Sequence, residues 1–314
     1  MIEEKLTVTD KELPVGENLI VLKNRLRGDG NGGRICIVTG THGDELEGQY
    51  VCYLVNRHIK RHPEKLKGTV DIYPALNPMG IDTIIRGIPG FDLDMNRTFP
   101  GNPDGAVTEQ IAHDVLADML GSDLVVDIHA SNIFLQELPQ ARISIETEES
   151  LLPLAKLLNL DLIWVHASST VLHSTLAHSL NSSGTKTIVA EMGVGMRVTK
   201  RYGEQLTKGL FNVMKALGIW EGDPEPLSDP YICHDDVEFI NAPVAGVFVP
   251  EVQQHHPVKR ETVIGKILEP LQGKTLSILK SPCSGVIFTL REYPIVDEGS
   301  LIARILRGAG GELK

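Results

Sequence analysis

The sequence is poor in cysteine, in basic residues relative to acidic ones, and in long apolar stretches. Its four cysteines form no close-spaced pair, which argues against a disulfide framework and against a cysteine-based zinc site. Lysine and arginine number 30 and aspartate and glutamate 41, so the net charge is -11. A nucleic-acid partner is not expected, because binding one requires a basic surface.

The apolar stretches fall well short of the ~20 residues that a membrane-spanning helix needs. The first residues, Met1–Glu4, are acidic rather than basic, and no apolar segment follows them. A secretory signal has the opposite pattern. We therefore expect a cytoplasmic protein with no membrane partner.

A chain of 314 residues forms one large domain or two ordinary ones. Hydrophobic residues make up 42% and charged residues 23%, which indicates a globular rather than a disordered protein. The segment Glu221–Pro230 is acidic, contains three prolines and has no apolar periodicity, as is typical of a linker. We predict a first domain over residues 1–220, a linker over 221–230 and a second domain over 231–314.

Short β-branched apolar segments alternate with segments of helical periodicity through the first two thirds of the chain. The predicted strands are Arg34–Thr39, Thr69–Leu76, Leu124–His129, Leu162–His166 and Thr185–Glu191. The predicted helices are Glu45–His62, Thr108–Leu120, Glu149–Leu158, His173–Leu180 and Lys200–Leu217. Strands separated by helices indicate an α/β domain with a mostly parallel or mixed sheet flanked by helices.

An internal repeat marks the end of the chain, where short strands and Gly/Pro turns replace the helices. Pro243–Phe248 resembles Pro282–Ile287, and Pro257–Leu268 resembles Pro294–Leu306. Two similar β units predict a small all-β barrel-sandwich in which each half covers the other. This layout resembles biotinyl and lipoyl carrier domains, but Lys274 lacks the flanking methionine of their modified lysine, so we favour a structural or oligomer-forming module.

Three predicted strands end in side chains that can bind a metal or transfer a proton. These residues are His42, Glu45, His129 and Glu191. In open α/β sheets, ligands bind beyond the carboxyl ends of the strands, so we expect these side chains to meet. One histidine at a strand end is more often a satisfied polar residue, but two histidines and a carboxylate form a common catalytic zinc shell.

Four ordered motifs resemble a known family. They are GTHGDE at 40–45, Asp-x-Asn-Arg-x-Phe-Pro-Gly at 94–101, DIHAS at 127–131 and AEMG at 190–193. Together they resemble the succinylglutamate desuccinylase/aspartoacylase deacylases, which are relatives of the zinc carboxypeptidases. The resemblance covers about residues 34 to 195 and implies a zinc-carboxypeptidase-like fold for the first domain, and a β domain at the end of the chain also fits members of this family.

The resemblance implies that His42, Glu45 and His129 hold one zinc ion per chain. It also implies that Glu191 is the general base that takes a proton from water and the general acid that passes it to the leaving amine. Two nearby aspartates are candidates for orienting the ligand histidines: Asp44 and Asp127.

The resemblance further implies that Asn96 and Arg97 bind a substrate carboxylate. An arginine fork suits this task because it can bind both carboxylate oxygens. Arg86, at the start of the same loop, would polarise the scissile carbonyl. Four other residues are left open as substrate contacts: Arg197, His166, His173 and His178.

These expectations describe a zinc-dependent amidohydrolase that removes the acyl group from a small, carboxylate-bearing N-acyl amino acid or a related linear amide. Two alternatives remain: a metallocarboxypeptidase acting on peptides, and a metal-bound but inactive scaffold. Glu191 favours an enzyme, because an inactive relative needs no carboxylate at that strand end. The sequence does not identify the acyl group or the amine, and it does not distinguish a monomer from a homo-oligomer.

Overall fold

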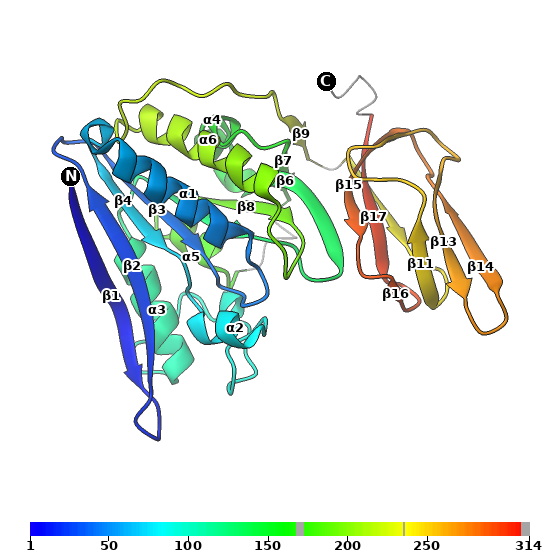
Figure 1. Ribbon diagram of the computed structural model, residues 1–314, viewed down its shortest axis with the longest axis horizontal. Coiled ribbons are helices and arrows are strands. Elements are labelled where there is room, and N and C mark those ends of the chain that lie inside the picture. Colours follow the sequence, from blue (N-terminus) through cyan, green and yellow to red (C-terminus); the bar gives the residue numbers. More distant parts are fainter. Residues whose placement is uncertain (168–172, 235, 309–314) are drawn as a thin grey trace.

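A mixed β-sheet runs through both parts of the chain (Figure 1). The computed structural model describes residues 1–167, 173–234 and 236–308, so residues 235 and 309–314 of the predicted second domain lie outside the described residues. The strands of the first part are β1 (Ile2–Glu12), β2 (Asn18–Arg27), β3 (Arg34–Thr39), β4 (Thr69–Tyr73), β5 (Leu124–His129), β6 (Leu135–Ser144), β7 (Leu162–His166), β8 (Thr187–Gly193) and β9 (Tyr231–Cys233).

The middle of this sheet is parallel. β4, β3, β5 and β8 run side by side in one direction, and β2 and β6 flank them in the opposite direction. Strands that are covered on both faces consist almost entirely of apolar residues. The buried sequence RICIVT of β3 is an example. The predicted α/β fold with a mixed sheet is confirmed. Within residues 1–220, the strands β1, β2 and β6 lie outside the predicted elements.

Helices cover both faces of the sheet (Figure 1). They are α1 (Glu47–Arg61), α2 (Pro78–Thr83), α3 (Val107–Met119), α4 (Glu148–Leu157), α5 (Leu176–Ser182) and α6 (Lys200–Ala216), with short 3-10 turns η1 (Pro63–Lys65), η2 (Met95–Arg97) and η3 (Ile145–Thr147). α1, α4 and α6 share one core with the sheet, and α3 and α5 share the other. Among the helices described, none has the length and apolar character needed to cross a membrane.

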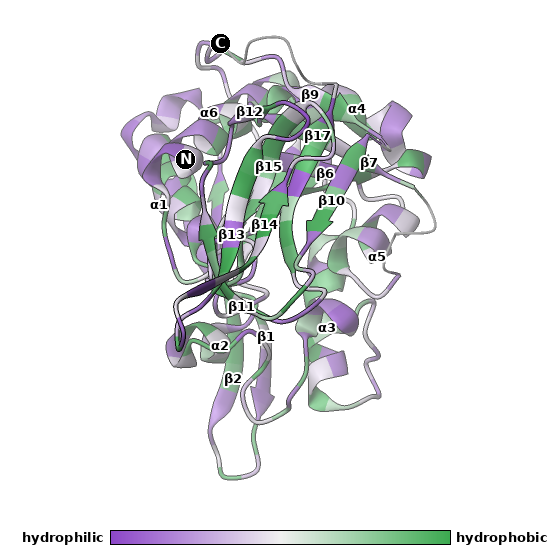
Figure 2. Ribbon diagram, turned by 90° about the vertical axis from the view of Figure 1, so that its right-hand side faces the viewer, coloured by the Kyte–Doolittle hydropathy of each residue, from purple (hydrophilic) through white to green (hydrophobic). Residues whose placement is uncertain are grey.

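The second part of the chain folds into two antiparallel sheets. Its strands are β10 (Val237–Asn241), β11 (Gly246–Pro250), β12 (Pro257–Val258), β13 (Val263–Glu269), β14 (Lys274–Lys280), β15 (Gly285–Arg291), β16 (Ile295–Val296) and β17 (Leu301–Arg307). β15, β17 and β10 extend the main sheet, while β14, β13, β11 and β16 form the other sheet. Figure 2 faces this part of the molecule and shows the apolar character of β15 and β17, whose residues contribute to the core of this part.

The sequence repeat corresponds to an exchange of short strands between the two halves. The first copy supplies β11, β12 and β13, and the second supplies β15, β16 and β17. β12 pairs with β15, and β16 pairs with β11. Each copy therefore completes the sheet of the other, and the predicted barrel-sandwich is confirmed. Lys274 lies exposed at the start of β14.

β15 joins the two parts of the molecule, because it pairs with β6 on one side and with β17 on the other. The segment 221–230 contains no helix or strand, and two hydrogen bonds between Asn212 and Glu225 fasten it to α6. β9, at the start of the predicted second domain, pairs with β7 of the first part. The three domain ranges stay a prediction.

Candidate active site

The His-x-x-Glu motif lies in a tight turn between β3 and α1. α1 begins only at Glu47, so His42 and Glu45 precede the helix. Gly43 is needed in this turn, because a Cβ at that position would lie 2.0 Å from the carbonyl carbon of Gly80. The turn brings His42 Nδ1 to 2.7 Å from Glu45 Oε1.

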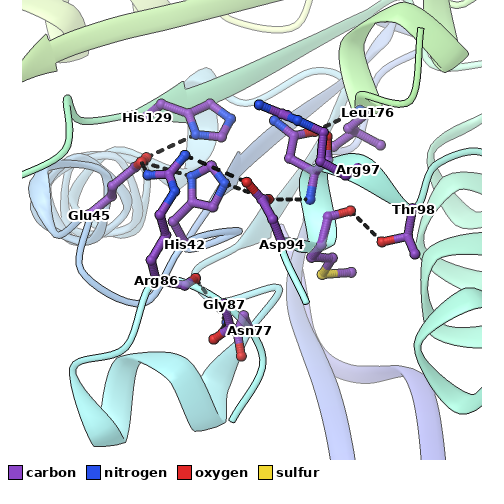
Figure 3. A network of polar contacts seen from close by, with 12 residues as sticks. His42, Glu45, Asn77, Arg86, Gly87, Asp94, Arg97, Thr98, His129 and Leu176 are labelled. Atoms are coloured by element: carbon purple, nitrogen blue, oxygen red, sulfur yellow. Dashed lines mark hydrogen bonds and ion pairs between the residues drawn. The ribbon is translucent and has the colours of Figure 1, made fainter. Parts of the chain in front are cut away.

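His42, Glu45 and His129 form a buried cluster, with their side chains turned toward one another (Figure 3). One potential ligand atom from each residue lies within 4.8 Å of the other two, and the exposed fractions of the three residues are 3%, 3% and 6%. His129 Nδ1 lies 2.9 Å from Glu45 Oε2, and the backbone N–H of Ala130 donates to the same oxygen.

This cluster fits a zinc ion. Two imidazoles and a carboxylate are a known ligand set of catalytic zinc sites. His42 Nδ1, which lies 2.7 Å from Glu45 Oε1, is a buried nitrogen that has no hydrogen bond within the described part of the chain. Buried polar atoms are nearly always satisfied, and a metal ion bound here would account for such atoms.

Each imidazole also faces an aspartate. His42 Nε2 lies 2.9 Å from Asp94 Oδ1, and His129 Nε2 lies 3.1 Å from Asp127 Oδ2. A carboxylate behind a metal-bound histidine orients the ring, so Asp127 lies where we predicted such a group, and Asp94 is an additional one. No hydrogen bond or ion pair joins Asp44 to either histidine among the residues described, so its predicted role is not supported.

The charges in the cluster are strongly coupled. Burial opposes ionisation of Glu45, but the adjacent imidazoles outweigh it and hold the pKa of Glu45 well below its usual range. Burial likewise opposes a charge on His129, but Asp127 and Glu45 raise the pKa of His129 well above its usual value. The metal-free cluster therefore holds protons, and metal binding is expected to release them.

β8 brings Glu191 next to this cluster. Glu191 is paired with His129 in the register of β5 and β8, and its side chain is 12% exposed. Burial raises the pKa of Glu191, although Arg142, with Nη1 3.0 Å from Glu191 Oε2, opposes the shift. A carboxyl group with a raised pKa in a cleft is suited to take up and return a proton.

The loop that ends in η2 carries the other three predicted site residues, and all three line the same cavity. Arg86 Nη1 donates to Glu45 Oε1 at 2.7 Å. Asn96 Oδ1 accepts a hydrogen bond from the backbone N–H of Leu176 at 2.9 Å, so this oxygen holds the loop against α5. Arg97 donates to the carbonyl oxygen of Asn96 and forms no ion pair with any described residue.

The cavity has a volume of about 750 Å³, within the range of small-molecule sites. His166, His173 and His178 line it. Burial lowers the pKa of His166 to about 4, so this side chain is neutral at pH 7. Arg197 does not line the cavity and lies 3.5 Å from Glu292.

Sequence reasoning missed several charged residues that line the cavity, among them Glu137, Arg142 and Arg304. Glu137 and Arg142 lie on β6, and Arg304 comes from β17 in the second part of the chain. The available signal for Glu137 and Arg142 was weak, because half of the ten residues of β6 (LQELPQARIS) are polar. Arg304 is a charge within the apolar segment LIARIL of β17, but only the pairing of distant strands brings it to the cavity.

Comparisons with known proteins agree with this geometry. The model of the succinylglutamate desuccinylase/aspartoacylase catalytic domain matches residues 31–217, which is more than half of the chain. An N-alpha-acetyl-L-2,4-diaminobutyric acid deacetylase from Halomonas elongata is 26% identical, over 96% of this chain and 89% of that protein.

Solved structures share the fold along nearly the whole chain. The product-bound ectoine utilization protein EutE (DoeB) from Ruegeria pomeroyi has a TM-score of 0.82 and 22% identity, covering 98% of this chain and 94% of that one. A succinylglutamate desuccinylase from a Silicibacter species has a TM-score of 0.84 and 21% identity, covering 97% and 94%. The matched region contains all four sequence motifs and the cluster they form, and the chain belongs to the succinylglutamate desuccinylase/aspartoacylase family.

Proposed function

We propose that this chain is a zinc-dependent amidohydrolase that removes the acyl group from a small N-acyl amino acid. The observation that carries the proposal is the position of Glu191 beside the cluster of His42, Glu45 and His129 in one cavity. The family and the name of the Halomonas relative, a deacetylase of an N-acetylated diamino acid, support the same class of reaction.

Each of these residues has a separate role in the proposed hydrolysis. Zinc, when bound to the cluster, supplies a Lewis acid that activates water and polarises the amide carbonyl. Glu191 takes a proton from the attacking water and delivers it to the leaving amine. Arg86, which lies against Glu45, provides positive charge where the carbonyl oxygen becomes negative.

Arg97 is the residue we propose for binding a substrate carboxylate. The other arginines that line the cavity are already paired with carboxylates: Arg86 with Glu45, Arg142 with Glu191, and Arg304 with Glu137. Arg97 donates to one backbone oxygen only, within the described residues. A guanidinium has five N–H donors, so Arg97 retains a fork for a bidentate contact.

The test of the function is a panel of N-acetyl and N-succinyl amino acids, with N-acetyl-2,4-diaminobutyrate and short peptides included, assayed for amine release by zinc-loaded protein. We expect hydrolysis of N-acyl amino acids. Hydrolysis of peptides alone would favour a metallocarboxypeptidase instead. A zinc-loaded protein that hydrolyses no member of the panel would be a metal-bound scaffold.

Replacing Arg97 with lysine should lower kcat/KM on a free-acid substrate by roughly 10-fold or more, because charged hydrogen bonds are worth ~1.5–3 kcal/mol. Lysine keeps the charge but loses the bidentate fork. The amidated form of the same substrate should be poor for the native chain and little affected by the substitution, because the contact is never made.

The four rates form a double cycle of enzyme and substrate that isolates the pairing of guanidinium and carboxylate. Lys200→Met is the matched control for a change of surface charge, because Lys200 does not line the cavity. Equal losses on the acid and on its amide would mean that Arg97 acts through structure rather than by binding the carboxylate.

A further inference from the structure

A row of polar side chains crosses the sheet from the C-terminal part of the chain to Glu191. Thr289 on β15 is the strand partner of Arg304 on one side and of Glu137 on the other. Gln140, further along β6, is the strand partner of Glu191. A bulge between Glu137 and Gln140 lets both side chains face the same way, and Gln140 Nε2 donates to Glu137 Oε2 at 3.0 Å.

Glu137 is the buried centre of this row, with an exposed fraction of 1%. Arg304 Nη1 donates to Glu137 Oε1 at 2.8 Å, and the Thr289 hydroxyl donates to Oε2. Arg142 Nη2 lies farther away, 3.5 Å from Oε1. A carboxylate removed from water needs charged or hydrogen-bonding partners, and Arg304 is the closest cation that meets this need.

Arg142 lies between two carboxylates. Its Nη1 is 3.0 Å from Glu191 and its Nη2 is 3.5 Å from Glu137. The ring of Trp164 lies beside both guanidinium groups, with its centroid 5.7 Å from Cζ of Arg142 and 5.6 Å from Cζ of Arg304. Because Arg304 already neutralises the Glu137 carboxylate, Arg142 can make its closer ion pair with Glu191.

We propose that Arg304 is a positioning residue for Glu191, and that the C-terminal β domain completes the active site through it. By neutralising Glu137, Arg304 leaves Arg142 to hold Glu191 beside His129. Without Arg304, the buried Glu137 carboxylate attracts Arg142 away from Glu191. The proposal rests on the proposed function, in which Glu191 transfers the proton.

The kinetic test is Arg304→Met. We expect kcat to fall about 10- to 100-fold while KM changes by less than about 2-fold, because a displaced proton-transfer group costs turnover rather than binding. Zinc content should not change. Adding Glu137→Gln removes the carboxylate that competes for Arg142. The double variant should therefore recover most of the lost kcat. A general loss of stability in Arg304→Met would not be reversed in this way.

Arg307→Met is the matched control. Arg307 lies on the same strand, its Nη1 is 3.9 Å from Glu238, and it does not line the cavity. If Arg304→Met does not fold, the double variant carries the test, because it leaves no unpaired charge on Glu137. Its kcat should then lie within about 3-fold of that of Glu137→Gln alone.

Crystal structures of the same variants provide a readout that does not depend on activity. The distance from Arg142 Nη1 to Glu191 Oε2, 3.0 Å in the native chain, should lengthen in Arg304→Met and return in the double variant. If the native chain hydrolyses no N-acyl amino acid, the proposed function fails, and this distance still tests the positioning. Native turnover in Arg304→Met, or a loss that persists in the double variant, would overturn the proposal.

Discussion

Replacing Glu191 with glutamine should lower kcat by on the order of 10²–10⁴ while zinc content and fold stay unchanged. Glutamine is nearly isosteric and can still accept a hydrogen bond from Arg142, which lies 3.0 Å from the native carboxylate. It cannot take a proton from water. The measurement is kcat on a good substrate together with zinc per chain in the purified variant.

Glu292→Gln is the matched control for this substitution. Glu292 lies 3.5 Å from Arg197 and does not line the cavity, so its kcat should equal that of the native chain. Native turnover in Glu191→Gln would remove Glu191 from the mechanism. A loss of zinc in Glu191→Gln would show that this residue supports the metal site rather than proton transfer.

His42→Ala and His129→Ala should each remove zinc and activity together. Either change leaves the buried Glu45 carboxylate with one of its two imidazole neighbours, and two protein ligands do not make a zinc shell of the catalytic type. Elemental analysis should find about one zinc per chain in the native protein and close to none in the variants.

The matched control removes two other histidines. His58 and His62 lie near the end of α1 with their ring centroids 5.2 Å apart, and neither lines the cavity. His58→Ala and His62→Ala should therefore keep stoichiometric zinc. Stoichiometric zinc in the double variant of His42 and His129 would rule out the site described above.

The metal cluster could be predicted because parallel strands deliver their carboxyl ends to one edge of a sheet. β3, β5 and β8 are buried strands whose apolar segments can be recognised in the sequence. They are neighbours in the sheet. His42 follows β3, His129 ends β5, and Glu191 lies two residues before the end of β8. Their convergence therefore required only the order of the strands. The C-terminal barrel-sandwich could be predicted because its two halves resemble each other.

The network around Arg142 could not be predicted, because it depends on pairings that no local pattern specifies. β6 pairs antiparallel with β8 and with β15, and a bulge decides which of its side chains face the cavity. The motif that contains Asn96 had a similar limit. The motif identified Asn96 as a site residue. It could not predict the hydrogen bond from the backbone N–H of Leu176 to the side-chain oxygen of Asn96, because that contact depends on the packing of α5.

Zinc dependence is measured by titrating zinc into the metal-free protein while following amine release from an N-acetyl amino acid. Turnover should rise in proportion to added zinc and stop rising at about one zinc per chain. His129→Ala should show no such rise over the same range. Equal turnover in the metal-free and zinc-loaded protein, with zinc measured in both, would show that hydrolysis does not depend on zinc.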